Sequence, residues 1–367
     1  MQTARIAIVG GGLAGLYAAH LLEHKGIHDY VLLEARDVWG GRIASAVGAG
    51  DAPLDRFDLG PTWFWPGYQP QLDRLIDSLG LERFAQHGDG DMLVEHTPNS
   101  APVRMRGYAS APPSVRLVGG MGALTGALRV GLAPGNLMPG WRVLRLRCDG
   151  RHVVLDAEGA QGRPGTLRAE QVLLAVPPRL AMALIDFAPV LPEPLARAWH
   201  GTATWMAPHA KYVALHDEPF WRDQGLSGEA RSARGPLGEI HDASMPGGSA
   251  ALFGFFGVPA RVRRGVSEEV LRRHCRAQFG RLFGEQAAMP KADFIKDWAA
   301  DPWTATAADQ DGPGQHGIAP AASVAEGLWQ GRITGIASEW STQFQGYVAG
   351  AVEAAARGFH TLLEQRP

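Results

Sequence analysis

The first 34 residues of the chain switch between two patterns of apolar positions. Residues 4–9 form an apolar run that stops at three consecutive glycines, and residues 30–33 form a second run that ends at Glu34. Between the runs, residues 13–25 carry leucines at helical spacing, and Gly26 is a typical helix C-terminal stop. This order of strand, helix and strand predicts a βαβ unit with two parallel strands.

The remaining patterns extend this α/β prediction along the chain. Two runs at 141–147 and 153–157 flank Asp149-Gly150, which is a hairpin signal. Further strands are expected at 172–176, 212–215, 250–256 and 332–336, and helices at 124–130, 268–283 and 346–363. We expect a doubly wound Rossmann-like domain built from discontinuous segments, with an α+β domain inserted between them.

Composition narrows the class of partner. The 367 residues carry a net charge of −2, so no charge excess favours nucleic acid or an anionic membrane as a partner. The two cysteines offer neither a disulfide framework nor a metal cluster, and no His/Glu spacing suggests a metal site. We see no targeting segment and no run of 18 apolar residues, and we expect a cytoplasmic protein without a membrane anchor.

Gly10, Gly12 and Gly15 complete a G-x-G-x-x-G string between the first predicted strand and the helix. Such a turn lets backbone N–H groups reach a pyrophosphate, and the helix N-terminus favours its negative charge. Glu34 follows 19 residues after Gly15, where a carboxylate can accept hydrogen bonds from ribose hydroxyls. This context predicts a dinucleotide site, and a Gly-rich turn beside a surface glutamate is the plainer alternative.

A second glycine pair follows directly, in the stretch EARDVWGGR at 34–42. A nicotinamide domain has no need of Gly-Gly-Arg at this position. FAD is a larger dinucleotide that lies across the loop, so it needs close backbone approach and a cation, Arg42, on its diphosphate. The stretch therefore predicts FAD, while a merely solvated charge at Arg42 is the alternative.

With these motifs the chain resembles the flavin-containing amine oxidase superfamily, as a short, bacterial-type, monoamine oxidase-like member. The resemblance extends to DLGPTW at 58–63, Gly119-Gly120-Met121, and the segments 174–178, 337–339 and 346–352, but hardly to 80–115 or 225–295. The cofactor-binding residues that it implies are Gly10, Gly12, Leu13, Ala14, Gly15, Glu34, Ala35, Arg36, Gly41, Arg42, Gly60, Pro61, Thr62, Trp63, Leu137, Glu339 and Val348.

The resemblance also implies two catalytic residues, Lys211 and Tyr347. Lys211 precedes Pro-Phe-Trp at the distance at which amine oxidases have a lysine that holds a water against flavin N5. A lysine in an apolar strand is costly to bury, which favours a function over a snorkelling structural lysine. Tyr347 follows Glu339 at the spacing of one tyrosine of the superfamily's aromatic pair; simple packing is the alternative. The expected substrate-lining residues are Trp63, Trp205, His209, which lies two residues before Lys211, Trp303 and Tyr347.

Two departures from the superfamily change the expected site. Ala307 and Ala308 stand where mammalian-type monoamine oxidases have the flavin-linking cysteine and a second cage tyrosine. FAD is therefore expected to be non-covalent, and the aromatic cage is incomplete unless a tryptophan supplies the second wall.

The resemblance implies an enzyme that transfers a hydride from an amine carbon to flavin N5 and reduces O2 to H2O2. Two alternatives stay open: a flavin desaturase or dehydrogenase that acts on C–C bonds, and a non-catalytic flavoprotein. We assign residues 1–78, 114–200 and 308–367 to the FAD-binding domain, and 79–113 and 201–307 to the substrate-binding domain. The substrate and the oligomeric state stay undetermined.

Overall fold

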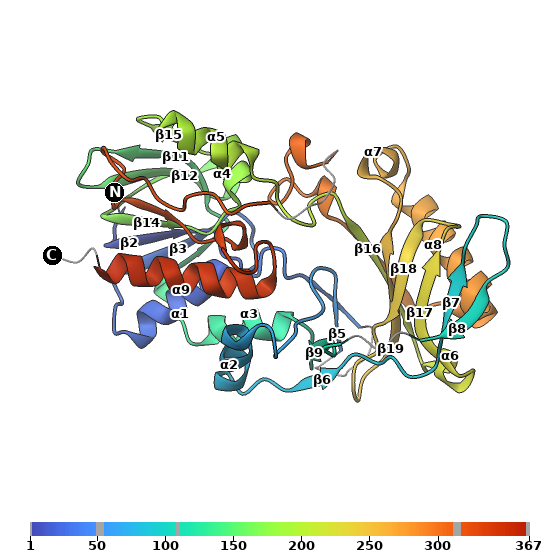
Figure 1. Ribbon diagram of the computed structural model, residues 1–367. Coiled ribbons are helices and arrows are strands. Elements are labelled where there is room, and N and C mark those ends of the chain that lie inside the picture. Colours follow the sequence, from blue (N-terminus) through green and yellow to red (C-terminus); the bar gives the residue numbers. More distant parts are fainter. Residues whose placement is uncertain (1, 49–54, 108–110, 311–316, 365–367) are drawn as a thin grey trace. The chain divides into compact units, whose positions relative to one another are not determined.

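A computed structural model describes residues 2–48, 55–107, 111–310 and 317–364 (Figure 1). The chain forms two compact units, each built from separate stretches of sequence. The first unit comprises Met1–Ile43, Leu124–Ala207 and Pro302–Pro367, and the second comprises Ala44–Ala123 and Pro208–Asp301.

A parallel five-stranded sheet forms the centre of the first unit. Its strand order is β10-β3-β2-β14-β21, so segments from three parts of the sequence lie side by side. The strands are β2 (Ile6–Val9), β3 (Tyr30–Glu34), β10 (Leu137–Pro139), β14 (Gln171–Leu174) and β21 (Ile333–Gly335). This crossover order confirms the predicted α/β class and the discontinuous Rossmann-like architecture.

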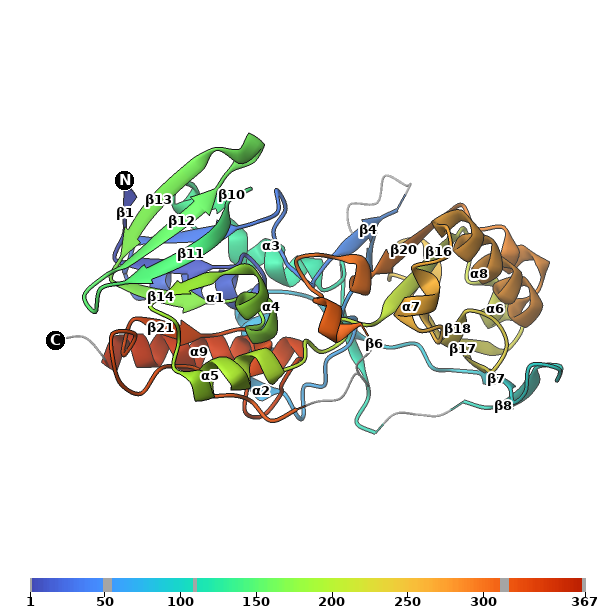
Figure 2. The ribbon, with the colours of Figure 1, turned by 90° about the horizontal axis from the view of Figure 1, so that it is seen from above.

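The two faces of the parallel sheet are covered differently. Helices α1 (Leu13–His24) and α9 (Val348–Glu364) pack together along one face (Figure 1). The strand positions Ala7, Val9 and Val31 point the other way, into a core shared with Leu146 and Leu155 of a second sheet. That sheet forms its own layer (Figure 2), in the order β1 (Gln2–Thr3), β13 (Pro164–Ala169), β12 (Val153–Glu158), β11 (Arg142–Cys148) and β15 (Asp186–Ala188).

Three further helices complete the elements associated with the first unit. They are α3 (Gly122–Val130), whose first two residues belong to the second unit, α4 (Pro178–Leu184) and α5 (Glu193–Gly201). The predicted hairpin around Asp149-Gly150 is confirmed, because β11 and β12 pair antiparallel across it.

A seven-stranded sheet dominates the second unit. Its order is β20 (Ala292–Asp297), β16 (Ala210–His216), β19 (Ala250–Phe256), β18 (Leu237–Asp242), β17 (Leu226–Ser232), β7 (Asp91–Glu95) and β8 (Val103–Arg106). Helix α8 (Glu268–Phe283) buries Cys275 and Phe279 against one face of this sheet. The other face carries Val213 and Phe253, which pack with Phe57.

The second unit also contains several short elements. They are β4 (Ser45–Val47) paired with β5 (Arg56–Asp58), β6 (Arg83–Ala85) paired with β9 (Val115–Leu117), and helices α2 (Pro70–Ser78), α6 (Phe220–Asp223) and α7 (Ala260–Arg263). Along the described stretches 2–48, 55–107, 111–310 and 317–364, no helix combines the length and the apolar character needed to cross a bilayer.

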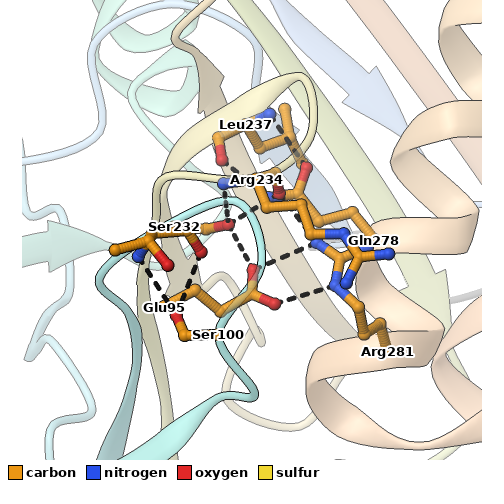
Figure 3. A network of polar contacts seen from close by, with 8 residues as sticks. Glu95, Ser100, Ser232, Arg234, Leu237, Gln278 and Arg281 are labelled. Carbon is orange, nitrogen blue, oxygen red and sulfur yellow. Dashed lines mark hydrogen bonds and ion pairs between the residues drawn. The ribbon is translucent and has the colours of Figure 1, made fainter.

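A buried polar network ties α8 to the strands of the second unit (Figure 3). The carboxylate of Glu95 is fully buried, and Arg281 of α8 donates to its two oxygens at 2.8 and 3.0 Å. Ser232 donates to the same carboxylate at 2.5 Å. Gln278, one turn earlier on α8, bonds both the N–H and the carbonyl of Leu237. The network compensates a charge that burial alone would make very costly.

We predict that Arg281→Met destabilises the protein strongly. The substitution leaves the buried Glu95 carboxylate without its cation, which costs about 3 kcal/mol of unfolding free energy. The matched control is Arg197→Met, which removes an ion pair with Glu193 whose side chains are 76% and 83% exposed and costs less than about 1 kcal/mol. Urea unfolding of both variants measures the difference, and equal losses would contradict this role of the network.

Candidate active site

The glycine turn between β2 and α1 has the geometry that the sequence predicts. Gly10 has φ +108°, a region that favours glycine. A Cβ at Gly15 would collide with the carbonyl oxygen of Gly10, so only glycine lets the helix start this close to the turn. Among the residues that the structure describes, no side chain caps the N-terminus of α1, and the first turn of this helix carries no acidic residue. Backbone N–H groups are thus presented for an anion such as a diphosphate.

Glu34 lies at the carboxyl end of β3 and is 5% exposed. One carboxylate oxygen accepts a hydrogen bond from the N–H of Gly11 at 2.7 Å, and the other accepts from the N–H of Arg36 at 2.8 Å. An ionised carboxylate has about four acceptor positions, so about two are left for ribose hydroxyls. The position therefore fits the dinucleotide role predicted for it.

The second glycine pair lies directly against the first. Gly40 donates its N–H to the carbonyl of Gly11 at 2.9 Å, and Gly12 and Gly40 form a parallel bridge. Gly41 has φ +59°, and a Cβ there would lie 3.0 Å from the Cα of Gly12. Larger side chains in the two glycine turns would fill the space in which the backbones of the turns come close to each other. The two turns thus form one surface of peptide groups, as a large dinucleotide requires.

Arg42 is held by Glu339, a residue far away in the sequence. Its guanidinium donates to the two carboxylate oxygens at 2.6 and 2.9 Å, and to the hydroxyl of Ser338 at 3.0 Å. The Glu339 side chain is 1% exposed, and that of Arg42 is 25% exposed. Three of the five guanidinium N–H groups are used, so two can still meet a diphosphate. The sequence placed both residues at the cofactor, but it did not predict their ion pair.

The other predicted cofactor positions of the first unit lie around these turns. Leu13 and Ala14 begin α1 and are buried, and Ala35 follows Glu34. Leu137 begins β10 and pairs with Leu32 of β3. Val348 is the first residue of α9.

Trp205 lies beside the segment that carries Tyr347. Gly346 has φ +80°, and a Cβ there would collide with the Trp205 side chain. Tyr347 is 38% exposed and immediately precedes α9. The guanidinium of Arg142 lies 5.3 Å from the ring centre of Trp303. Of the predicted aromatic wall, the structure therefore brings Trp205 close to the Tyr347 segment.

In the second unit, Lys211 lies on β16 and is 2% exposed. Its ammonium donates to the Thr62 hydroxyl at 2.5 Å and to the Gly60 carbonyl at 3.3 Å. The same nitrogen lies 3.9 Å from the ring centre of Phe253, a cation–π distance. Lys211 thus contacts the Gly60-Pro61-Thr62 segment that the resemblance places beside the flavin.

Trp63 follows that segment and joins the aromatic side chains around Lys211. Its ring centre lies 5.4 Å from that of Phe253 and 4.9 Å from that of His241, and its indole N–H donates to Gln86 at 2.8 Å. His209 immediately precedes β16, which begins at Ala210. The pKa of His209 is lowered by burial and by the charge of Arg263.

Two charged residues near Lys211 were not predicted as part of the site. Burial lowers the pKa of Lys211 to about 7, Asp58 opposes this shift, and Arg116 adds to it. Asp58 stands in the quoted DLGPTW motif, but its charge was overlooked. Arg116 lies in β9, within a region where the resemblance is slight. In the sequence, each of these two charged residues stands next to apolar residues that are buried, and this is the signal that could have identified them.

Glycine turns at a helix N-terminus, a carboxylate after the second strand and a buried lysine define the class, a dinucleotide-binding oxidoreductase. Comparisons with known proteins then give the family. The flavin containing amine oxidoreductase family matches residues 100–358, and the NAD(P)-binding Rossmann-like domain family matches residues 8–79. The chain belongs to the flavin containing amine oxidoreductase family, and it is an FAD-dependent oxidoreductase.

Individual relatives agree with this assignment. A putrescine oxidase of Kocuria rosea is 34% identical over 163 residues, which is 41% of this chain and 32% of that relative. A probable flavin-containing monoamine oxidase A of Dictyostelium discoideum is 24% identical over 96% of both chains. Among solved structures, a putrescine oxidase matches with a TM-score of 0.81 at 19% identity over 100% of both chains. Cyclohexylamine oxidase from Brevibacterium oxydans matches with a TM-score of 0.79 at 19% identity over 99% of both chains. These two structural matches confirm the fold.

We predict that Gly15→Ala weakens FAD binding at least about tenfold, which is about 1.4 kcal/mol. The added methyl group forces the start of α1 away from Gly10, so the N–H groups of the turn lose their alignment. The matched control is Gly126→Ala in α3, where a Cβ meets nothing within 4 Å. The ratio of flavin to protein after purification and the dissociation constant of FAD measure the effect. Full FAD occupancy in Gly15→Ala would show that this turn is not the dinucleotide site.

Proposed function

We propose that this protein is an amine oxidase that uses O2 as its electron acceptor in the cytoplasm. The observation that carries the proposal is the burial of Lys211 against Gly60 and Thr62. A lysine that donates to one carbonyl and one hydroxyl in an aromatic surrounding is costly to bury, which favours a function for it. The names of the relatives indicate amines as the substrate class.

The proposed reaction removes two electrons and two protons from an amine. Bound FAD supplies the acceptor of the hydride and returns the electrons to O2, which becomes H2O2. The C–H bond next to nitrogen breaks, the amine becomes an imine, and water hydrolyses the imine to a carbonyl compound and ammonia. The substrate must lose its hydride as a neutral amine, because an ammonium group has no lone pair to support that loss.

Each predicted residue receives a role in this proposal. The glycine turns, Glu34 and Arg42 bind the cofactor, and the lone pairs and N–H groups left on these two side chains fit that role. Lys211 holds a water molecule for proton transfer and O2 reduction. Tyr347 and Trp205 form an aromatic wall. A carboxylate in their place would favour the charged ammonium form of the substrate.

The proposal also assigns a function to each segment of the chain. Residues 1–78, 114–200 and 308–367 are proposed to bind FAD, and 79–113 and 201–307 to bind the substrate. Ala307 lies in a short 3-10 helix, Ala307–Asp309, and is exposed. It has no thiol, so FAD is held without a covalent link at this position.

We predict that Lys211→Met slows reoxidation by O2 about tenfold or more, while anaerobic reduction by the substrate changes much less. Methionine keeps the approximate length and apolar stem of lysine and removes the positive charge, which stabilises the superoxide formed after the first electron leaves. Stopped-flow absorbance of the flavin, recorded separately for the two half-reactions, measures both rates. The matched control is Lys291→Met, whose wild-type side chain is 57% exposed.

The same experiment tests the function itself. Monoamines, diamines and amino acids are mixed anaerobically with the wild-type protein, and at least one amine is expected to bleach the flavin. Bleaching by an amine followed by slow reaction with O2 would favour a dehydrogenase, the activity named for a Synechocystis relative that is 26% identical over 58% of this chain. Wild-type reoxidation in Lys211→Met would remove Lys211 from the proposed role. An absence of bleaching by every amine would overturn the amine oxidase proposal.

A further inference from the structure

Three charged side chains are buried together in the second unit. Asp58 of β5 is 4% exposed, Arg116 of β9 is 2% exposed, and Lys211 of β16 is 2% exposed. Asp58 and Arg116 both act electrostatically on Lys211, and they act on each other. Asp242 and Arg222 also act on Arg116. Two cations and one anion in a surrounding of low polarity are strongly coupled, because little water screens them.

The backbone of the Gly119-Gly120 turn and of Met121 fixes the Asp58 carboxylate. Gly119 and Gly120 both have positive φ, and a Cβ at Gly120 would lie 2.7 Å from the Oδ1 atom of Asp58. The next residue, Met121, donates its N–H to that oxygen at 2.8 Å. Within the described part of the chain, the Oδ2 atom has no hydrogen-bond partner. One oxygen is therefore anchored. Burial raises the pKa of Asp58 to about 6, and the positive charges of Lys211 and Arg116 oppose this shift.

The guanidinium of Arg116 is held by neutral groups. Its guanidinium donates to the carbonyls of Ala243 and Ser244 at 2.9 and 3.1 Å, and it lies 4.9 Å from the ring centre of Phe84. These partners are neutral, so they hold the guanidinium in place without cancelling its charge. Its field acts on Lys211 in the direction opposite to that of Asp58.

Other polar groups face Lys211 from the strands beside it. Lys296 is its cross-strand neighbour on β20, and its ammonium is paired with Asp301 at 2.5 Å. Farther along the same face, His241 and Glu239 of β18 bond each other at 2.6 Å. Phe253 and Phe255 of β19 present their rings. The charges of Lys296 and Glu239 have partners of their own, which leaves Asp58 and Arg116 as the charges that act on Lys211.

We propose that Asp58 and Arg116 are positioning residues that together set whether the Lys211 side chain is an ammonium or a neutral amine. Asp58 favours the ammonium and Arg116 favours the amine. With both present, burial lowers the pKa of Lys211 to about 7. A lysine in this range can donate or accept a proton at its water ligand. The catalytic consequence rests on the proposed function, whereas the control of charge does not.

The test is an NMR titration of the flavoprotein labelled with 13C at the lysine Cε atoms. The chain contains only four lysines, Lys25, Lys211, Lys291 and Lys296, so the spectrum is simple, and Lys211→Met assigns the signal. In Asp58→Asn, the pKa of Lys211 should fall by about one pH unit or more, because an opposite charge is lost. In Arg116→Gln, which can still donate to a carbonyl, the pKa should rise by a similar amount. The control is Asp293→Asn, because that buried aspartate pairs with Arg272 and Arg276.

Opposite shifts in the two variants, with no shift in Asp293→Asn, would support the proposal, because a merely structural disturbance has no reason to reverse its sign. If Asp58→Asn does not fold, the upward shift in Arg116→Gln decides alone. An unchanged Lys211 titration in the folded variants would overturn the proposal. Failure of the proposed function leaves this titration intact and is recognised separately, by the absence of flavin bleaching with every amine.

Discussion

Burying one ammonium group in a β-sheet is the constraint on which the second unit depends. Lys211 lies in a strand whose other residues are buried. Its nitrogen donates to the Thr62 hydroxyl and the Gly60 carbonyl and lies over the ring of Phe253. Such a group is tolerated only when nearby polar groups are fixed. The Gly119-Gly120 turn, the anchored Asp58 carboxylate and the Thr62 loop supply that fixed surrounding.

In the first unit, the main constraint is the close approach of backbone segments and not the burial of a charge. Two glycine turns come together where any Cβ would obstruct the approach, as at Gly15 and Gly41. The charged groups at this site, Glu34 and Arg42, are each already bonded within the protein. Their orientation is therefore set before a ligand arrives, which lowers the entropy that binding must overcome. The unit is prepared for a dinucleotide by its own hydrogen bonds.

The sequence predicted local features well and distant partners poorly. The βαβ unit, the Asp149-Gly150 hairpin and the strand of Lys211 follow from periodicity and turn residues, because neighbours in the chain determine them. The pairing of Arg42 with Glu339 and the grouping of Asp58 with Arg116 depend on how separate segments meet. No pattern within one segment contains that information. The sheet that covers the second face of the parallel strands was missed for the same reason.

The central claim is that the fold accepts a buried lysine at a cost in stability. Its most direct test is the free energy of unfolding of the wild type and of Lys211→Met, measured with urea between pH 7 and about 10. In the folded state, burial lowers the pKa of Lys211 from 10.5 to about 7. Between these values the unfolded chain holds a proton that the folded chain has lost, so wild-type stability rises with pH. The account predicts that the free energy of unfolding of the wild type rises relative to that of Lys211→Met, by about 1.4 kcal/mol for each unit of increase in pH. Parallel stability profiles would contradict it.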